Sequence, residues 1–254
     1  MSTTRVRPVM ACVATGNRPD AGLVFATDLA LRMGKPLRLV HVDREGRPAV
    51  GDQILTPDLA ELEAAVRYAA SVGAIRPESA PRQALETERV QWTGAVRDGL
   101  VRLADGACVV VVMRRSLSRP RRLLAGSLST HLAARASVPV VVVPEFWAPW
   151  HRTVPRITIV RGAGADVDAA DDAELRSLLP DGVVEEVHIR SRHRLDDLVE
   201  LSRFADLLVI ARAPAGGLAP VARELLRRAH CPVATCRRSH HLARMGSRPS
   251  QVGT

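Results

Sequence analysis

The chain has 254 residues, of which 46% are hydrophobic and 25% are charged, and it carries a net charge of +9. This balance is typical of a folded globular protein and excludes a disordered or fibrous chain. The longest apolar runs are too short to span a bilayer, and no apolar leader follows the first residues, so we expect a cytoplasmic protein without membrane contact.

The positive charge comes almost entirely from arginine, since Lys35 is the only lysine. Such a skew, in a chain also rich in Ala and Val, is typical of GC-rich coding sequences, although a polyanion partner remains an alternative. Aromatic residues make up only 3% of the chain, too few for base-stacking platforms, so we do not expect a nucleic-acid partner. No Cys-x-x-Cys pair occurs, and reduced, buried thiols are predicted for four residues: Cys12, Cys108, Cys231 and Cys236.

Strand and helix patterns alternate through the first half of the chain. The helix at 20–33 is expected to end at Gly34, because glycine is favoured just past a helix C-terminus. The strand at 83–90 is predicted to lie at a sheet edge. Five strands joined by helices predict a doubly wound parallel α/β sheet. The predicted strands are 6–14, 36–42, 83–90, 108–113 and 139–143, and the predicted helices are 20–33, 57–72, 94–103 and 127–136.

The segment 144–155 contains three prolines together with Trp147 and Trp150, and it breaks this alternation as an inter-domain connector does. The alternation then resumes in a shorter form. The residues at 239–254 have little apolar periodicity and are predicted to form a disordered basic tail. The later strands are predicted at 157–160, 183–189, 207–211 and 232–234, with helices at 169–179, 195–202 and 218–230.

Two passages of the chain resemble each other: "ADGACVVVVM … LSTHLAARASVPVVVVP" and "FADLLVIARA … VARELLRRAHCPVATCR". Each contains an apolar strand, a loop, a helix and a proline before a final short strand. The two prolines, Pro139 and Pro232, lie 93 positions apart, which is too short a period for two equal units. We therefore predict two tandem domains, at 1–145 and 156–238, the second lacking one strand and one helix.

These passages resemble the universal stress protein family, through "RPVMACVATGN", "KPLRLVHV", "ACVVVVM" and "GSLSTHLAARASVPVVVVP" in the first unit and "RAHCPVATCR" in the second. The resemblance implies the flavodoxin-like or HUP-like form of the doubly wound fold, in two tandem domains. It also implies a stress-response or regulatory protein. The chain has no G-x-S-x-G elbow and no metal-ligand spacing, so we expect neither catalysis nor a bound metal.

Many members of this family bind ATP through a loop patterned Gly-x2-Gly-x9-Gly-Ser/Thr after the fourth strand. Glycines there let the backbone approach the phosphates, and the helix N-terminus supplies N–H groups. In this chain Gly126 and Ser127 match the end of the pattern, but Met113 and Ser116 hold the first two glycine positions. The acid that nucleotide-binding members carry after the first strand is also missing. The resemblance therefore predicts a degenerate loop and no ATP cofactor, with a drifted but working nucleotide site as the alternative.

Arginines fill the same loop, and Arg114 is the first of five between Met113 and Gly126. Guanidinium groups bind phosphate well, so the loop is either a charge-built phosphate or polyanion site or a solvated surface loop. Any nucleotide or phosphate is expected to contact these residues: Gly16, Val42, Arg115, Arg121, Arg122, Gly126 and Ser127.

Two predictions concern how the units meet. We predict two separate sheets, one of five parallel strands and one of about four. The resemblance also implies an internal pseudo-dimer in which the two final strands lie side by side, since domains of this family commonly pair through their last strands. Such pairing would remove two exposed apolar edges, and Trp147 or Trp150 is expected to cover the seam. An unidentified protein partner is expected, and a homodimer is possible.

Overall fold

The computed structural model describes residues 6–13, 21–43, 85–93, 95–114, 128–148, 154–162, 178, 182–189, 195–212 and 217–236. The predicted helix at 57–72, most of that at 169–179 and the tail at 239–254 lie outside them. The described strands are β1 (Val9–Val13), β2 (Leu37–Asp43), β3 (Thr87–Thr93), β4 (Val109–Arg114), β5 (Val140–Pro144), β6 (Arg156–Gly162), β7 (Val183–Ile189), β8 (Leu207–Ala211) and β9 (Val233–Cys236). The described helices are α1 (Ala21–Met33), α3 (Val96–Ala104), α5 (Leu128–Arg135), α7 (Leu195–Leu201) and α8 (Pro220–Arg228).

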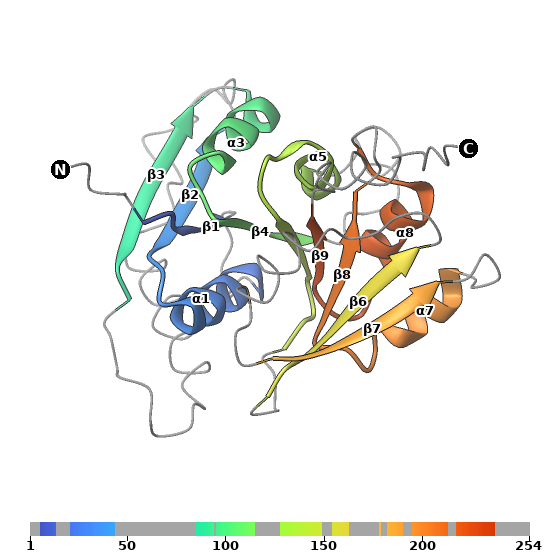
Figure 1. The fold of residues 1–254 in the computed structure, drawn as a ribbon. Helices are drawn as coiled ribbons and strands as arrows, with labels where there is room; N and C mark the ends of the chain where they lie inside the picture. The colour runs from blue at the N-terminus through green and yellow to red at the C-terminus, as the bar shows by residue number, and fades with distance from the viewer. Residues whose placement is uncertain are drawn as a thin grey trace, which may run out of the picture.

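All nine strands form one sheet in the order β3-β2-β1-β4-β5-β9-β8-β6-β7 (Figure 1). The prediction of two separate sheets is therefore wrong. Strands β1 to β5 are mutually parallel, as are β6 to β9, and only the β5–β9 pair is antiparallel. The separate-sheet prediction failed because it treated each final strand as the edge of its own sheet, whereas these two edges hydrogen-bond to each other.

The seam between β5 and β9 joins the two halves of the sheet, and it confirms that the final strands are adjacent. Val140 pairs with Thr235, Val141 with Ala234, and Val142 with Val233. Val141 and Ala234 are separated by 93 positions, the same offset as the two prolines. Equivalent residues therefore face each other at the centre of the seam, which is the arrangement of an isologous two-fold contact within one chain.

The order of strands in the second half repeats that of the first, with one strand fewer. Read outward from the seam, the first half runs β5, β4, β1, β2, β3 and the second runs β9, β8, β6, β7. The missing element in the described second half corresponds to β3, as predicted from the short repeat period.

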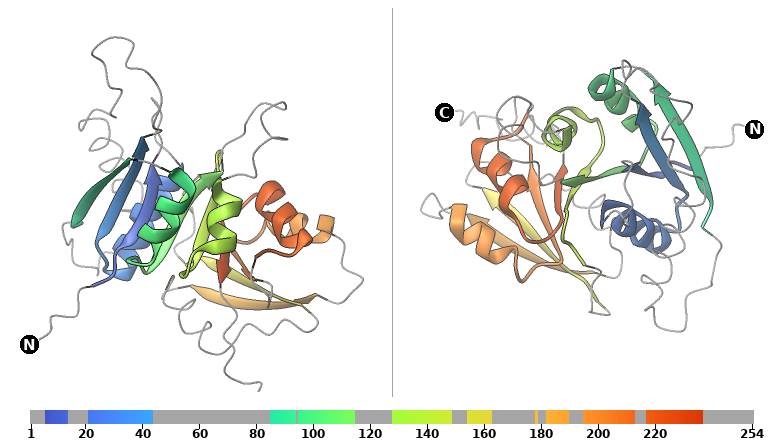
Figure 2. Two further views of the ribbon diagram at one scale, coloured as in Figure 1. Left: turned by 90° about the horizontal axis from the view of Figure 1, so that it is seen from above. Right: turned by 180° about the vertical axis from the view of Figure 1, so that it is seen from behind.

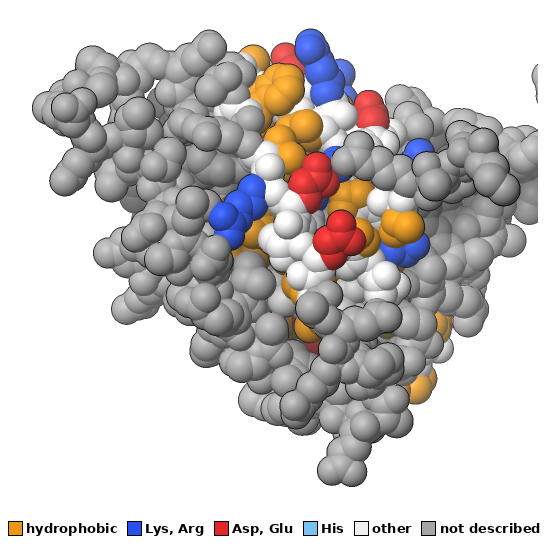
Figure 3. Space-filling view, turned by 90° about the vertical axis from the view of Figure 1, so that its left-hand side faces the viewer, with side chains coloured by type: hydrophobic (Ala, Val, Ile, Leu, Met, Phe, Trp, Pro, Cys, Tyr) orange, Lys and Arg blue, Asp and Glu red, His pale blue; other side chains and the backbone are white. Residues whose placement is uncertain are grey.

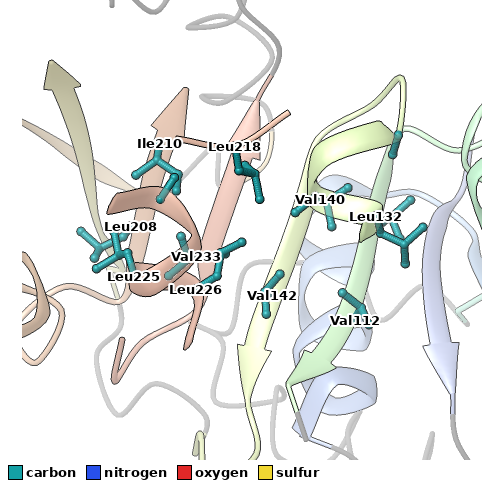
Figure 4. Packing of buried hydrophobic residues seen from close by; sticks show 14 of the residues in the cluster. Val112, Leu132, Val140, Val142, Leu208, Ile210, Leu218, Leu225, Leu226 and Val233 are labelled. Atoms are coloured by element: carbon teal, nitrogen blue, oxygen red, sulfur yellow. The ribbon is translucent and has the colours of Figure 1, made fainter. Parts of the chain in front are cut away.

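Helices cover the sheet on both faces (Figure 2), with α1 on one face and α3, α5, α7 and α8 on the other. Each face has one apolar core, and both cores contain residues from both halves of the sheet. On the α5/α8 face, Val140 and Val142 lie across the seam from Val233 and Leu226 (Figure 4). Each buried apolar core is thus continuous across the seam. Removal of these side chains from water stabilises both halves of the sheet.

Trp147 contributes to the core on the α1 face. Its ring meets Phe25 of α1 edge-on, with the ring centroids 5.3 Å apart, and it packs against the cluster that includes Val141 and Ala234. That a tryptophan covers the seam stays a prediction. Trp150 lies outside the described residues.

Local sequence signals set the ends of helix α1 and the edge of the sheet. Gly34 has a φ of +59°, and the Lys35 amide donates to the Ala30 carbonyl, which gives the glycine-terminated helix end predicted. Strand β3 is an edge strand, as predicted, and extends to Thr93. Acidic and basic side chains lie beside hydrophobic ones on this side of the molecule (Figure 3). Charges of this kind discourage pairing with another strand.

Among the described helices, none combines the length and hydrophobicity that a membrane-spanning segment needs.

Candidate ligand site at the carboxyl ends of the strands

Doubly wound sheets bind ligands outside the carboxyl ends of the strands, where the strand order reverses. In the first half this point lies between β1 and β4, which pair through Cys12 and Val112 just before their ends. In the second half the equivalent point lies between β6 and β8. The topology therefore provides two candidate sites, one in each half.

In the first half, apolar side chains lie at the ends of these two strands. Val13 ends β1 and Met113 is the penultimate residue of β4, and both are half-buried and pack against the core on the α1 face. Neither position carries an acid or a glycine. The described ends of these strands therefore carry neither the carboxylate nor the first loop glycine that nucleotide-binding members of the resembled family have.

The predicted site residues fall mostly on segments that the structure does not describe. Val42 lies in β2, opposite Trp92 of β3, and only its backbone is described. The grouping of the predicted residues into one site stays a prediction, as does their expected contact with phosphate. The residues outside the described ranges are Gly16, Arg115, Arg121, Arg122, Gly126 and Ser127.

Arg114, the first arginine of the predicted loop, makes a contact that neither interpretation of the loop included. Its guanidinium donates from Nη1 to the Leu226 carbonyl oxygen (3.1 Å) and from Nη2 to the Ala229 carbonyl oxygen (3.0 Å). Both acceptors lie at the C-terminal end of α8, where carbonyl groups lack partners within the helix. Arg114 is therefore bound to the other half of the sheet.

Arg212 makes the reciprocal contact and was not predicted. Directly after β8, it is only 4% exposed and donates to the Ala136 carbonyl oxygen and, over 2.9 Å, to the Val138 carbonyl oxygen. These acceptors follow helix α5. Aligning the two repeated passages would have paired Arg212 with Arg114, because each arginine directly follows the apolar residues of an equivalent strand.

Two described titratable groups near these strands have shifted pKa values. Burial raises the pKa of the Cys231 thiol to about 12, so this thiol stays protonated and inert. On α5, the pKa of His131 is lowered by burial and by the charges of Arg97 and Arg135. In the part of the chain that the structure describes, no three metal-ligating side chains come together.

Solved structures share this fold along almost the whole chain. A functionally unknown protein from Pseudomonas aeruginosa PAO1 has a TM-score of 0.62 at 10% identity, covering 92% of this chain and 93% of its own. A putative universal stress protein from Pseudomonas aeruginosa UCBPP-PA14 has a TM-score of 0.61 at 9% identity, with coverage of 92% and 94%. A universal stress protein from Archaeoglobus fulgidus has a TM-score of 0.52 at 11% identity, with coverage of 92% and 98%. At such identities the likeness shows the fold alone.

No curated protein matches the chain significantly. The profile of the universal stress protein family matches residues 6–144, more than half of the chain. These residues include the strands β1 to β5, of which β5 is the seam strand, so the match covers one complete five-stranded unit. The chain therefore belongs to the universal stress protein family.

Proposed function

We propose that this protein is a non-catalytic stress-response or regulatory binding protein of the cytoplasm, in which the nucleotide-binding loop no longer holds ATP. Two tandem units, 1–145 and a shortened 156–238, form an internal pseudo-dimer. The ligand of this chain is then another protein, which the surface of the pseudo-dimer recognises.

The observation that carries this proposal is the apolar packing of Val13 and Met113 at the reversal point of the first half. A nucleotide bound there needs a hydrogen-bond acceptor for its base or sugar and a backbone open enough to reach its phosphates. A Met side chain in the first glycine position hinders the approach of the phosphates to the backbone and restricts the conformation of the backbone there. A Val side chain at the end of β1 offers no acceptor.

The sheet supports the tandem organisation and the pseudo-dimer. The strand order repeats about the seam, and the offset of 93 positions that relates Val141 to Ala234 also relates Pro139 to Pro232. Because β5 and β9 cover each other, the edge that an isolated unit would present to a second copy is already used. A homodimer of the whole chain must therefore form through another surface.

Isothermal titration of the purified chain with ATP, with and without Mg²⁺, tests the lost nucleotide site. We expect a dissociation constant no tighter than about 1 mM, or roughly −4 kcal/mol. The purified protein is also expected to carry no nucleotide when it is denatured and its supernatant is analysed by chromatography.

A variant with both glycines restored, Met113→Gly with Ser116→Gly, is the matched comparison. Tighter ATP binding by this variant than by the parent would show that Met113 and Ser116 weaken the nucleotide site. A micromolar 1:1 constant for the parent itself would show that the loop still works, and the proposed function would be wrong.

A further inference from the structure

The seam between β5 and β9 is short and nearly uniform in sequence. Only three residue pairs join the strands, and β5 consists of four valines followed by Pro144. A slip by two residues would put Val142 opposite Thr235 and Val143 opposite Ala234, with each side chain still on its present face of the sheet. Register is weakly specified when the side-chain pattern of a strand survives such a slip.

Two arginines cross this seam in opposite directions. Arg114 reaches from the end of β4 to the end of α8, and Arg212 reaches from the end of β8 to the end of α5. They occupy equivalent positions: Arg114 follows Val110 by four residues and Arg212 follows Leu208 by four, and these residues pair with Val140 and Val233.

One acceptor of each arginine is equivalent as well, whereas the second acceptors, Leu226 and Val138, are not. Ala136 and Ala229 are again separated by 93 positions, and each is the residue directly after its helix. The amide of Ala136 donates to the Leu132 carbonyl and that of Ala229 to the Leu225 carbonyl, so both helices end in the same way. The two contacts form one symmetric pair about the seam.

Each guanidinium depends on these contacts. Arg212 is almost completely buried, and a buried charge is tolerated only where hydrogen bonds compensate for lost water. The C-terminal end of a helix supplies unpaired carbonyl groups and a partial negative charge. A slip by two residues moves the strands by roughly 6–7 Å and would remove both arginines from their acceptors.

We propose that Arg114 and Arg212 are positioning residues that set the register of the β5–β9 seam and make the two halves a matched pair. The partner that each arginine recognises is the carbonyl-bearing end of the last helix in the opposite half. Buried polar groups that fix register in this way are known in helical assemblies, where they select one alignment among several apolar ones. Arg114 is then committed to the seam and does not serve as a phosphate ligand.

Amide NMR of the full-length chain tests this assignment with the double variant Arg114→Met/Arg212→Met. Methionine keeps an apolar, unbranched side chain but cannot donate to carbonyls. We expect doubled or exchange-broadened resonances for 140–143 and 233–236, with single resonances retained in β1 and β2. A single set of resonances that keeps the parent's cross-strand contact between Val140 and Thr235 would overturn the proposal, because packing alone would then fix the register.

The matched control is Arg38→Met. Arg38 is also a mostly buried arginine, with its side chain 12% exposed, but it pairs with Glu88 inside the first half. This control is expected to lower stability while leaving one set of seam resonances. Doubling in the control as well would show that the effect follows from general destabilisation, and the proposal would fail.

Single variants keep the proposal testable if the double variant does not fold. In Arg114→Met, hydrogen-exchange protection of the β5 and β9 amides should fall about tenfold relative to that of β1. An equal loss of protection throughout the sheet, or none at the seam, would contradict a register role. The same measurement on Arg212→Met should give a larger change, since Arg212 is the more buried of the pair.

Discussion

The two halves of the sheet resemble each other most closely where they meet and differ most at their outer edges. At the seam, strand register, helix ends and arginines all repeat. At the outer edges, the first half ends in β3, with Trp92 packed against Gly99 of α3, whereas the second ends one strand earlier in β7. Val183 of β7 is 61% exposed. This contrast indicates that the buried seam, which must fit both halves at once, constrains the repeat more than the edges do.

Smaller differences remain within the seam itself. Val142 and Thr235 are equivalent positions, but only the threonine adds a hydroxyl, which lies 3.3 Å from the carbonyl oxygens of both Ala133 and Val140. Thr235 therefore adds a buried hydrogen bond that its equivalent, Val142, cannot make. Three substitutions test how much each region contributes.

Placing a charge in the seam should have the largest effect. Val142 is 2% exposed and pairs with Val233, so Val142→Asp buries a carboxylate without a partner. We expect a loss of more than about 4 kcal/mol in the free energy of unfolding, together with aggregation or separation of the halves. Light scattering and thermal denaturation measure both.

Val221→Asp is the control for this change, because Val221 lies on α8 and is 48% exposed. It should melt close to the parent. If Val142→Asp also scattered and melted like the parent, the seam described here would not hold the halves together.

Adding one methyl group at the outer edge of the first half should have an intermediate effect. A Cβ at Gly99 would lie 2.1 Å from Nε1 of Trp92, so the indole or the helix must shift. Gly99→Ala should cost about 1–3 kcal/mol from overpacking, and this loss exceeds the gain of up to about 1 kcal/mol from helix propensity. Urea denaturation gives the sign directly.

The neighbouring Gly106→Ala is the matched comparison. There, the nearest atom to an added Cβ is Nη1 at the end of the Arg38 side chain, at 3.2 Å, and the expected change is smaller. A Gly99→Ala variant more stable than the parent would mean that Trp92 does not pack against this helix.

Removing the buried hydroxyl of Thr235 from the seam should have the smallest effect. Thr235→Val places valine at the position equivalent to Val142 and removes the buried hydroxyl. We expect a loss of about 1 kcal/mol, the usual net contribution of one hydrogen bond. Urea midpoints of the two proteins under identical conditions measure it.

Thr158→Val provides the contrast. Thr158 is fully buried in β6, and among the described residues its hydroxyl has no hydrogen-bond partner. This change should be neutral or stabilising, because it removes a buried hydroxyl that makes no bond. Equal losses in the two variants would show that the Thr235 hydroxyl contributes no seam hydrogen bond.

Much of the fold was predictable from apolar periodicity. The strand at 207–211 has the predicted bounds, and β3 was correctly placed at an edge although its end was set three residues too early. That the described second half has no counterpart of β3 agrees with the short period between Pro139 and Pro232. The contacts of Arg114 were less predictable, because this residue lies in an arginine-rich run that looks like a solvated loop in the sequence, and the predicted site residues in that run lie outside the described ranges.

The sequence by itself determined the order of the described strands and helices, the family and the repeat, because each follows from local periodicity or from a motif carried by neighbouring residues. The adjacency of the final strands followed from the family resemblance. Only the tertiary structure decided that the halves share one sheet and that Arg114 and Arg212 cross its seam. Arg114 and its acceptors are 112 and 115 positions apart, and those of Arg212 are 76 and 74. No local pattern encodes such a contact, because an arginine next to a strand can face solvent, a phosphate or the carbonyl end of a distant helix. The packing of the two halves against each other selects the last of these environments.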